Sequence, residues 1–365
     1  MKIQANMRQS NFEVMRIVAM MMIVVAHLLQ RCFIVDVYPG FTLNGLVIKS
    51  CYLLGQLGNV LFILLSGWFI SETTFSWKKV AKLWFEVFFY SVVIGSVFFA
   101  FRIPFCARDR LALFTGWTDE MRVPDVKDFL RCFFPVIQSH NWFATSYLGF
   151  FMFSPFLAAL TANLPKERHK TLAVLSLFLG SWPLFNLLGG SSFPFFTLYF
   201  VVSYIKRFPP RFLERPRRCF VLGMVTFALI VAWNAAVIVA AGRIGFVGQR
   251  LDSFLGLASG TNKLPTVLCG LFFFCGVRNS SVNQSRCINA IAASTFGVYL
   301  IHSNYFVARS PRWAVCSDVL FSSPWMIPYV LGLSLSVFAV CIVIDMLRKR
   351  LFAFVAKGFV LVRRG

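Results

Sequence analysis

The chain has 365 residues, of which 58% are hydrophobic and only 14% charged, whereas a soluble domain usually carries about 25% charged residues. Its 44 Phe and nine Trp residues are more apolar surface than one aqueous core can bury, so the composition excludes a soluble enzyme, a disordered chain and a secreted disulfide scaffold. The net charge of +22 lies in short clusters between apolar runs and forms no basic stripe, which argues against nucleic acid as a partner. These features predict a multi-spanning membrane protein with membrane lipids as its surroundings.

Ten apolar segments predict membrane-spanning helices, because a helix needs about 17–25 mostly apolar residues to cross a bilayer. The ten segments are 12–34, 46–70, 81–101, 142–163, 171–188, 193–206, 219–241, 264–278, 288–308 and 324–347. The segments 193–206 and 264–278 are short, so totals of nine or eleven stay open. The predicted fold class is therefore an all-α integral membrane bundle of about ten transmembrane helices.

The distribution of charge between the loops predicts which side of the membrane each loop faces. With the N-terminus inside, most of the 36 basic residues fall in cytoplasmic segments, while most of the 14 acidic residues fall in outer loops. An even number of spans then places both termini in the cytoplasm. We expect residues 1–350 to form the membrane domain and residues 351–365 to form a basic cytoplasmic tail. The longest outer loop, 102–141, is long enough to cap an outward-facing site.

The first predicted helix carries three ionisable residues, and each needs a reason because a charge inside a bilayer is costly unless it is paired or hydrated. Arg16 and His27 face nearly the same way, about 16 Å apart along the helix. Glu13 lies three residues before Arg16 and is placed to pair with it. Arg16 therefore either orients a ligand or reaches the interface beside Glu13. His27 lies too deep to reach the interface, which favours a functional role.

Two further His residues are predicted near the outer face. His302 lies near the outer end of its helix, and His140 precedes Trp142 at the start of another. A lone interfacial His is usually a packing residue, so the grouping of three imidazoles in the outer half carries more weight than any one of them. His169 lies in a basic cytoplasmic loop and is expected to be solvated.

Cations and small polar residues mark the predicted cytoplasmic ends of the second and third helices. Lys79 and Lys82 follow Lys78 beside a helix start, where they either bind the phosphates of a cofactor or anchor the helix against anionic lipids. Ser66 and Gly67 interrupt an apolar run, which is normally a sign of close helix packing.

Four short motifs have an order and spacing that a known family shares. Arg16, a ten-residue gap and His27 come first, Leu61–Phe69 follows in the second helix, and Asn141–Phe143 and Phe296–His302 come later. Together they resemble membrane acyltransferase family 3, the integral-membrane enzymes that O-acylate polysaccharides and other envelope glycans. The resemblance extends from about residue 11 to residue 304, and members of this family have about ten helices.

The resemblance implies a donor, an acceptor and roles for the candidate residues. The donor is cytoplasmic acyl-CoA, most often acetyl-CoA, and the acceptor is a sugar hydroxyl of an envelope glycan or a lipid-linked saccharide on the outer side. His27 acts as general base or forms a transient acyl-imidazole, and Arg16 orients the donor. Lys79 and Lys82 neutralise the donor phosphates; many members carry two Arg residues here, and Lys lacks the bidentate contact of Arg.

Three more residues, His302, Ser66 and Trp142, are predicted to bind substrate. The resemblance also implies a multi-pass protein of a bacterial plasma membrane. The ten Cys residues include no CxxC pair and most lie in apolar runs, so they predict buried thiols and neither a metal site nor a redox site.

Two other classes of membrane protein stay open. A transporter or flippase for glycans or small anions also needs a polar pathway, which Arg16 and His27 would supply, but the chain shows no pair of related halves with broken helices. A haem- or quinone-binding protein would need imidazoles that face each other across the bundle. His27 and His302 are the candidates for such a pair, although nothing in their spacing specifies it.

Overall fold

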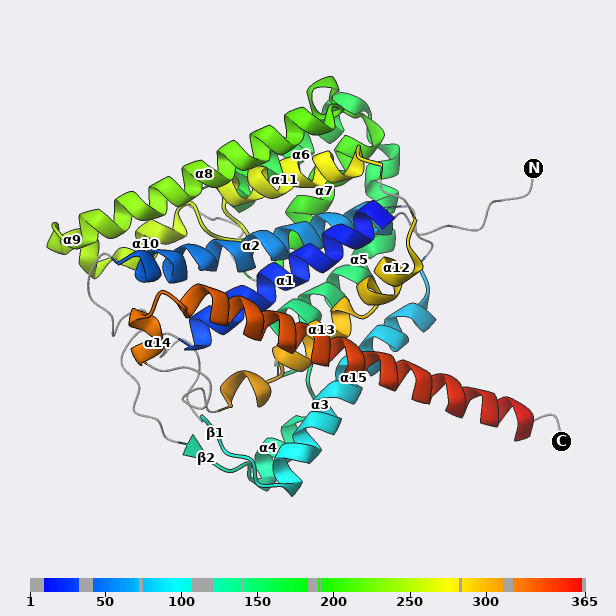
Figure 1. Cartoon of the computed structure of the whole chain (residues 1–365). Coiled ribbons are helices and arrows are strands. Elements are labelled where there is room, and N and C mark those ends of the chain that lie inside the picture. The colour runs from blue at the N-terminus through cyan, green and yellow to red at the C-terminus, as the bar shows by residue number, and fades with distance from the viewer. Residues whose placement is uncertain are drawn as a thin grey trace.

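The computed structural model describes residues 10–32, 42–71, 75–106, 121–138, 141–182, 190, 192–281, 284–310 and 318–362. Most of these residues are helical, and the described part of the chain contains one two-stranded antiparallel sheet (Figure 1). The longer helices are α1 (Ser10–Cys32), α2 (Leu43–Ile70), α3 (Trp77–Ala100), α5 (Trp142–Asn163), α6 (Lys166–Ser181), α7 (Phe193–Arg207), α8 (Pro216–Ala241), α11 (Leu264–Arg278) and α15 (Met326–Val362). The short elements are β1 (Phe105–Cys106), β2 (Met121–Arg122), α4 (Val126–Arg131), η2 (Arg211–Leu213), α9 (Gly245–Gln249), α10 (Leu251–Gly256), α12 (Arg286–Ala292), α13 (Thr295–His302), η3 (Val307–Arg309) and α14 (Asp318–Ser322).

Six of the described helices are long and apolar enough to cross a membrane, namely α1, α2, α3, α5, α8 and α15. This confirms the predicted class, an all-α membrane protein. A helix also lies in each of the other four predicted segments, but α6, α7, α11 and α13 have only 16, 15, 15 and 8 residues. The total of ten spans therefore stays a prediction.

The predicted helix 288–308 is wrong as a single span, because the chain breaks there into α12 and α13. Ala293 and Ser294 form a turn between the two helices, and α13 ends at His302. The residues at the break gave no sign of it, since both Ala and Ser are compatible with a helix interior. The last helix is longer than its predicted span: α15 continues to Val362, through residues that we expected to form a separate tail.

Several other helices begin before the apolar segments that predicted them. α3 begins at Trp77 rather than at residue 81, and α8 begins at Pro216, whose ring suits the first turn of a helix. The difference arises because first turns carry polar and basic residues near the membrane surface, and an apolar window leaves these out.

The helices α1 and α2 lie side by side in the middle of the bundle (Figure 1). Glycines let their backbones approach: a Cβ added at Gly58 would lie 2.6 Å from the carbonyl oxygen of Ala19, and Gly55 faces Ala26. Gly67 packs in the same way against α7, as the Ser-Gly interruption predicted. Because α1 also contacts α11, α12, α13 and α15, its polar side chains face other helices on several sides.

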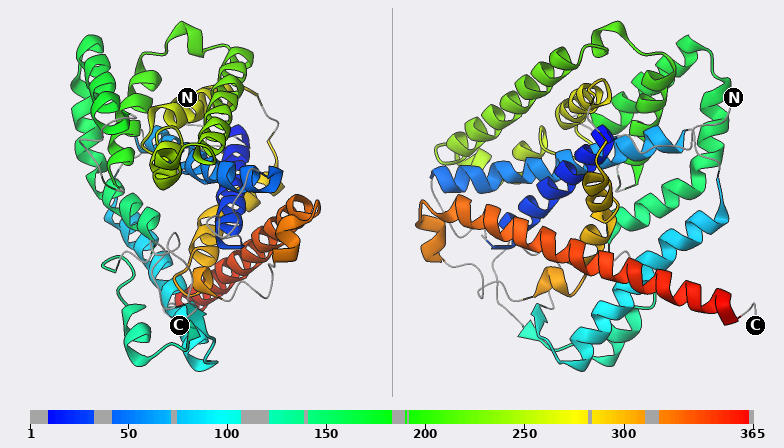
Figure 2. Two further views of the ribbon diagram at one scale, coloured as in Figure 1. Left: turned by 90° about the vertical axis from the view of Figure 1, so that its left-hand side faces the viewer. Right: turned by 45° about the vertical axis from the view of Figure 1, so that its right-hand side comes forward.

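The described parts of the long loop before α5 form a cap at one edge of the molecule, opposite α8 (Figure 2). Phe105 of β1 and Phe98 of α3 pack against the ring of Phe306, which follows His302 by four residues. The loop therefore lies next to the end of α13, while its role in capping or lining a site stays a prediction. Residues 107–120 of the loop lie outside the described residues.

An ion pair holds this cap together. Arg122 of β2 forms two hydrogen bonds with the buried carboxylate of Asp128 on α4, one of which is 2.9 Å long between Nη2 and Oδ1. Asp125 and Asp128 also form a reciprocal capping box at the start of α4. Burial raises the pKa of the Asp128 carboxyl, but the hydrogen bonds from Arg122 and from the Asp125 backbone outweigh burial, so this pKa lies below its usual value.

The start of α1 and the end of α15 both lie toward the right of Figure 1, and the last turns of α15 project beyond the other helices (Figures 1 and 2). Two helix ends on the same side of the molecule agree with an even number of membrane-spanning helices. That this side faces the cytoplasm stays a prediction from the loop charges.

We expect Gly58→Ala to destabilise the protein, because the added methyl group would overlap the Ala19 carbonyl and push α1 and α2 apart. Overpacking of this kind costs about 1–3 kcal/mol. The matched control is Gly149→Ala on α5, where no other described atom lies within 4 Å of the added Cβ and where Ala favours the helix. Thermal unfolding in detergent measures both variants, and equal melting temperatures would contradict the close contact between α1 and α2.

Candidate active site

Two imidazoles from opposite ends of the chain meet inside the bundle. The Nδ1 atom of His27 on α1 lies 3.0 Å from the Nε2 atom of His302 on α13, and the ring centroids are 5.2 Å apart. His302 is buried, whereas His27 is half-buried and keeps part of its surface accessible. The structure therefore brings together two residues that the sequence singled out, although 275 positions separate them.

The backbone fixes which nitrogen of each ring carries a proton. The Nδ1 atom of His302 lies 2.7 Å from the carbonyl oxygen of Val298, which can only accept, so this nitrogen is protonated in neutral His302. The Nε2 atom of His302 then carries a lone pair and accepts the Nδ1–H of His27. In the neutral pair the lone pair of His27 is therefore on Nε2, where a general base needs it.

The same contact bears on the haem alternative. Two nitrogens that lie 3.0 Å apart and share a hydrogen bond cannot bind to opposite faces of one haem iron. Within the described residues, three His, Cys, Asp or Glu side chains do not come together anywhere as a metal-binding group. Two imidazoles that share a hydrogen bond can pass a proton between them.

Arg16 forms the ion pair that its spacing from Glu13 predicted. Its Nη1 atom lies 2.7 Å from Oε1 of the buried Glu13, and its guanidinium lies over the ring of Phe69 at 5.3 Å. The Arg16 side chain is still 27% exposed. Because a guanidinium has five N–H donors, it can bind a ligand while it remains paired.

Ser66 and Tyr147 extend the polar group around Arg16. Tyr147 of α5 interacts with the side chain of Ser66 on α2 and lies close enough to Arg16 to be affected by its charge. The Ser66 hydroxyl also donates to the carbonyl of Phe62, 2.7 Å away. Tyr147 was missed as a site residue because a Tyr in an apolar segment is more often a packing residue. Only the packing of α1, α2 and α5 brings Tyr147 within reach of Ser66 and of the charge of Arg16.

A row of aromatic rings from α5 and α13 links this polar group to the imidazole pair. The ring of Tyr147 lies 6.3 Å from that of Phe296, Phe296 stacks with Tyr299 at 6.4 Å, and Tyr299 lies 6.1 Å from His302. Along α1 the two polar groups are about 16 Å apart. The ring contacts therefore run from Tyr147 on α5 to the imidazole pair.

Trp142 lies at the side of this row. Its side chain is 38% exposed, and its ring packs on Phe143 at 5.6 Å. The neighbouring Asn141 accepts a hydrogen bond of 3.1 Å from Ser303, which directly follows His302. This hydrogen bond brings Asn141 close to the imidazole pair, and a substrate contact by Trp142 stays a prediction.

The basic residues that the structure brings together beside one Trp ring are a different pair from the predicted phosphate-binding residues. Lys79 and Lys82 lie in the exposed first turns of α3. Beside Trp68 of α2, Lys206 lies 4.6 Å and Arg278 4.9 Å from the centre of the indole ring. In the sequence these two are ordinary basic residues at loop boundaries. The sequence signal that could have found them is that each lies in the last turn of an apolar helix, α7 or α11.

His169 is fully buried, so the expectation of a solvated residue was wrong. It lies in the first turn of α6, with its Nε2 atom 3.1 Å from the hydroxyl of Ser203 on α7. Its ring packs edge-on against Tyr204 and Phe208. The basic residues next to it occupy the exposed face of α6, whereas His169 lies on the face that packs against α7. His140 lies outside the described residues.

These features define an all-α membrane protein that holds a hydrogen-bonded imidazole pair and a partly exposed guanidinium inside its bundle. A family model described as an acyltransferase domain matches residues 9–346. The chain therefore belongs to membrane acyltransferase family 3, as its motifs predicted. No curated protein and no solved structure matches the chain.

The tautomers of the imidazole pair can be measured without an assay of activity. In protein labelled with ¹⁵N in its four His side chains, we expect protons on the Nδ1 atoms of both His27 and His302 at neutral pH. Solid-state NMR reports the protonation of each nitrogen, and the variants His27→Gln and His302→Gln assign the signals. His169→Gln is the control that should leave the pair unchanged. A proton on Nε2 of neutral His302 would contradict the assignment.

Proposed function

We propose that the protein transfers an acyl group, acetyl in the first instance, from cytoplasmic acyl-CoA to a sugar hydroxyl on the outer side of a bacterial plasma membrane. The acceptor is an envelope polysaccharide or its lipid-linked precursor. The observation that carries the proposal is the hydrogen bond between His27 and His302, because it leaves the lone pair of His27 on Nε2. Membership of an acyltransferase family supports the reaction class.

In the proposed reaction the acceptor oxygen attacks the thioester carbonyl carbon while Nε2 of His27 takes the hydroxyl proton. The bond between that carbon and the sulfur then breaks, and the thiolate takes the proton from His27, which leaves an ester and a free thiol. The Nε2 lone pair of His302 accepts the Nδ1–H of His27 and stabilises the imidazolium that forms in between. In this role His302 positions the base, in addition to the predicted contact with substrate.

An acyl-imidazole on His27 is the second form of the same proposal. The acyl group then moves from sulfur to Nε2 and from Nε2 to the acceptor oxygen, while the hydroxyl proton ends on the thiolate. This form suits a donor and an acceptor that approach from opposite sides of the membrane. Ping-pong kinetics distinguishes it from direct transfer.

Arg16 is proposed to orient the donor, with Ser66 and Tyr147 beside it. Glu13 occupies one of the guanidinium donors, and the partial exposure of Arg16 lets a carbonyl or anionic group of the donor reach the others. In this proposal an elongated donor, whose charged end and reactive carbonyl lie far apart, would reach Arg16 with one part and His27 with another.

Further substrate contacts are proposed for residues with exposed side chains. Lys79 and Lys82 are proposed to bind the donor phosphates where α3 begins. Trp142 is proposed to contact the acceptor, because its partly exposed ring lies beside Asn141 and so near the end of α13. Ser66 and His302 complete the set of proposed substrate contacts.

Membranes that contain the protein, incubated with acetyl-CoA labelled in the acetyl group, are expected to transfer label to glycan as an alkali-labile ester. His27→Ala is expected to lower the rate about 10²–10⁴-fold, as loss of a general base does. Immunoblotting of the membrane fraction controls for insertion and abundance. Label that persists in the variant would contradict the role of His27 and keep the reaction class. If the wild-type protein labels nothing with a series of acyl donors and lipid-linked acceptors, the result would favour a transporter.

The paired variant Lys79→Ala with Lys82→Ala is expected to raise the KM for acyl-CoA and to leave kcat nearly unchanged, because it removes binding that is uniform through the reaction. Lys166→Ala with Lys170→Ala is the matched control, since these two Lys residues are also exposed at a helix start, on α6. Steady-state kinetics with varied acyl-CoA measures both. An unchanged KM in the first pair would support an anchor for anionic lipids in place of a phosphate site.

A further inference from the structure

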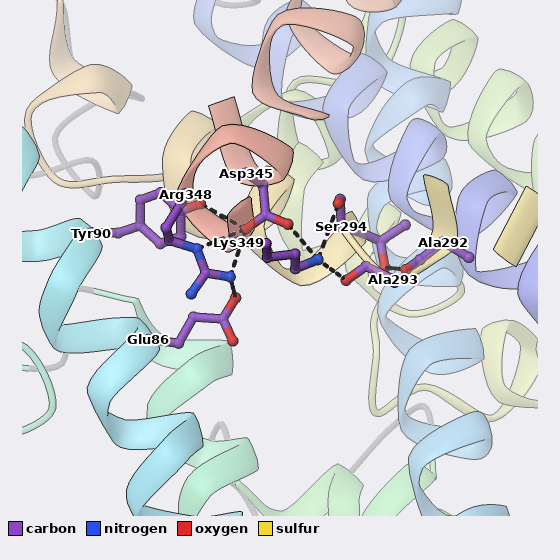
Figure 3. A network of polar contacts seen from close by, with 9 residues as sticks. Glu86, Tyr90, Ala292, Ala293, Ser294, Asp345, Arg348 and Lys349 are labelled. Carbon is purple, nitrogen blue, oxygen red and sulfur yellow. Dashed lines mark hydrogen bonds and ion pairs between the residues drawn. The ribbon is translucent and has the colours of Figure 1, made fainter. Parts of the chain in front are cut away.

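A network of charged side chains, with a buried carboxylate at its centre, joins α3, α15 and the break between α12 and α13 (Figure 3). At its centre Asp345 of α15 is completely buried. One of its carboxylate oxygens accepts hydrogen bonds from Tyr90 at 2.7 Å and from Arg348 at 2.8 Å, and the other pairs with Lys349 at 2.6 Å. Arg348 also pairs with Glu86 of α3 at 2.7 Å, so two acids and two bases balance each other.

Lys349 carries the network to the start of α13. Its ammonium group donates to the carbonyl of Ala293 at 2.7 Å and to the hydroxyl of Ser294 at 3.1 Å (Figure 3). Both residues belong to the turn between α12 and α13, where a broken helix leaves backbone groups without intrahelical partners. Asp345 therefore holds Lys349 in the place where it satisfies the Ala293 carbonyl.

Asp345 also contacts α13 directly, in the first turn of that helix. A Cβ added at Gly297 would overlap the Asp345 carboxylate, so the approach of the carboxylate requires glycine at this position. The N–H groups of a first turn attract a carboxylate beside them. The start of α13 is thus held by a carboxylate and by an ammonium group at the same time.

The opposite end of α13 carries His302. With eight residues α13 is too short to be stable alone, so its position depends on its contacts. The ring of His302 is fixed to its own helix by the hydrogen bond to Val298. Because two helical turns move as one unit, a shift at Ser294 or Gly297 moves the His302 ring relative to His27. A hydrogen bond of 3.0 Å tolerates little movement of this kind.

We propose that Asp345 is a positioning residue for the imidazole pair: through Lys349 and Gly297 it sets the position of α13, and so holds His302 against His27. The kinetic consequence of this proposal rests on the proposed function. Its structural consequence, an α13 that is held in place by Asp345, is independent of any reaction.

The alternative role of the network is to join α3 to α15 without any effect on α13. The two roles differ in which carboxylate matters. Glu86 pairs with Arg348 and so connects α3 to α15, whereas Asp345 contacts α13 and also holds Lys349 at its start. Asp345→Asn and Glu86→Gln each remove one negative charge at nearly constant size, so they leave the same charge imbalance and form a matched pair.

Hydrogen exchange in the purified, membrane-reconstituted protein tests the structural consequence. Asp345→Asn is expected to release Lys349 from the turn and to speed the exchange of the α13 amides about tenfold or more. Glu86→Gln is expected to leave their exchange within about twofold of wild type. Mass spectrometry of peptides that cover residues 295–302 measures both variants. Equal exchange of α13 in the two variants would overturn the proposal.

Gly297→Ala is the second variant, for the case in which Asp345→Asn does not accumulate in the membrane. By propensity alone Ala would stabilise α13, because it is a better helix former than Gly. The proposal expects faster exchange of the α13 amides, since the added methyl group displaces the Asp345 carboxylate. Slower exchange in this variant would overturn the proposal.

The transfer assay tests the kinetic consequence. Asp345→Asn is expected to lower kcat about tenfold or more while the KM for acetyl-CoA changes less than about twofold, because the donor site is intact. In a His302→Gln background the same substitution is expected to cost little further activity, since the residue through which it acts is already gone. An undiminished effect in that background would overturn the proposal. If the wild-type protein transfers no acyl group while exchange of α13 responds to Asp345→Asn, the proposed function fails and the positioning of α13 stands.

Discussion

Lipid offers no hydrogen bonds, so a polar side chain inside a membrane bundle needs a partner from the protein, and this constraint organises the whole molecule. On α1, Arg16 pairs with Glu13 at 2.7 Å and His27 with His302 at 3.0 Å. On α15, Asp345 lies among cations and the hydroxyl of a Tyr. The contacts of His27 and Asp345 join helices that are distant in the chain. The interactions that make buried polar groups tolerable thus also fix how the helices are placed.

The turn between α12 and α13 has a structural cost and a consequence for the site. It interrupts the backbone hydrogen bonds of an apolar segment, and Lys349 offsets part of that loss by binding the Ala293 carbonyl. After the turn, α13 packs against α15, α1 and α3. His302, the residue proposed to position the base, therefore lies on a short helix whose place depends on contacts with other helices.

The basic residues of this protein occupy three kinds of surroundings, and the residues next to them in the sequence do not show which kind each one occupies. Lys79 and Lys82 are exposed at a helix start, Lys206 and Arg278 lie over the ring of Trp68, and Arg348 is nearly buried between two carboxylates. The first pair stands out in the sequence because its members are close in the chain. The second becomes visible only when α7 and α11 end beside α2, because residues far apart in the chain form one cluster only in space.

The sequence by itself determined the membrane class, the helical character of the apolar segments and the family, and it singled out His27 and Arg16 as candidates. Hydropathy and short motifs are local properties, and an ionisable residue stands out against an apolar run. Only the tertiary structure decided the break at Ser294, the partner of His27, the tautomers of the imidazole pair and the contact of Asp345 with α13. These depend on which helix surfaces meet, and no window of the sequence contains both sides of a contact between residues 275 positions apart.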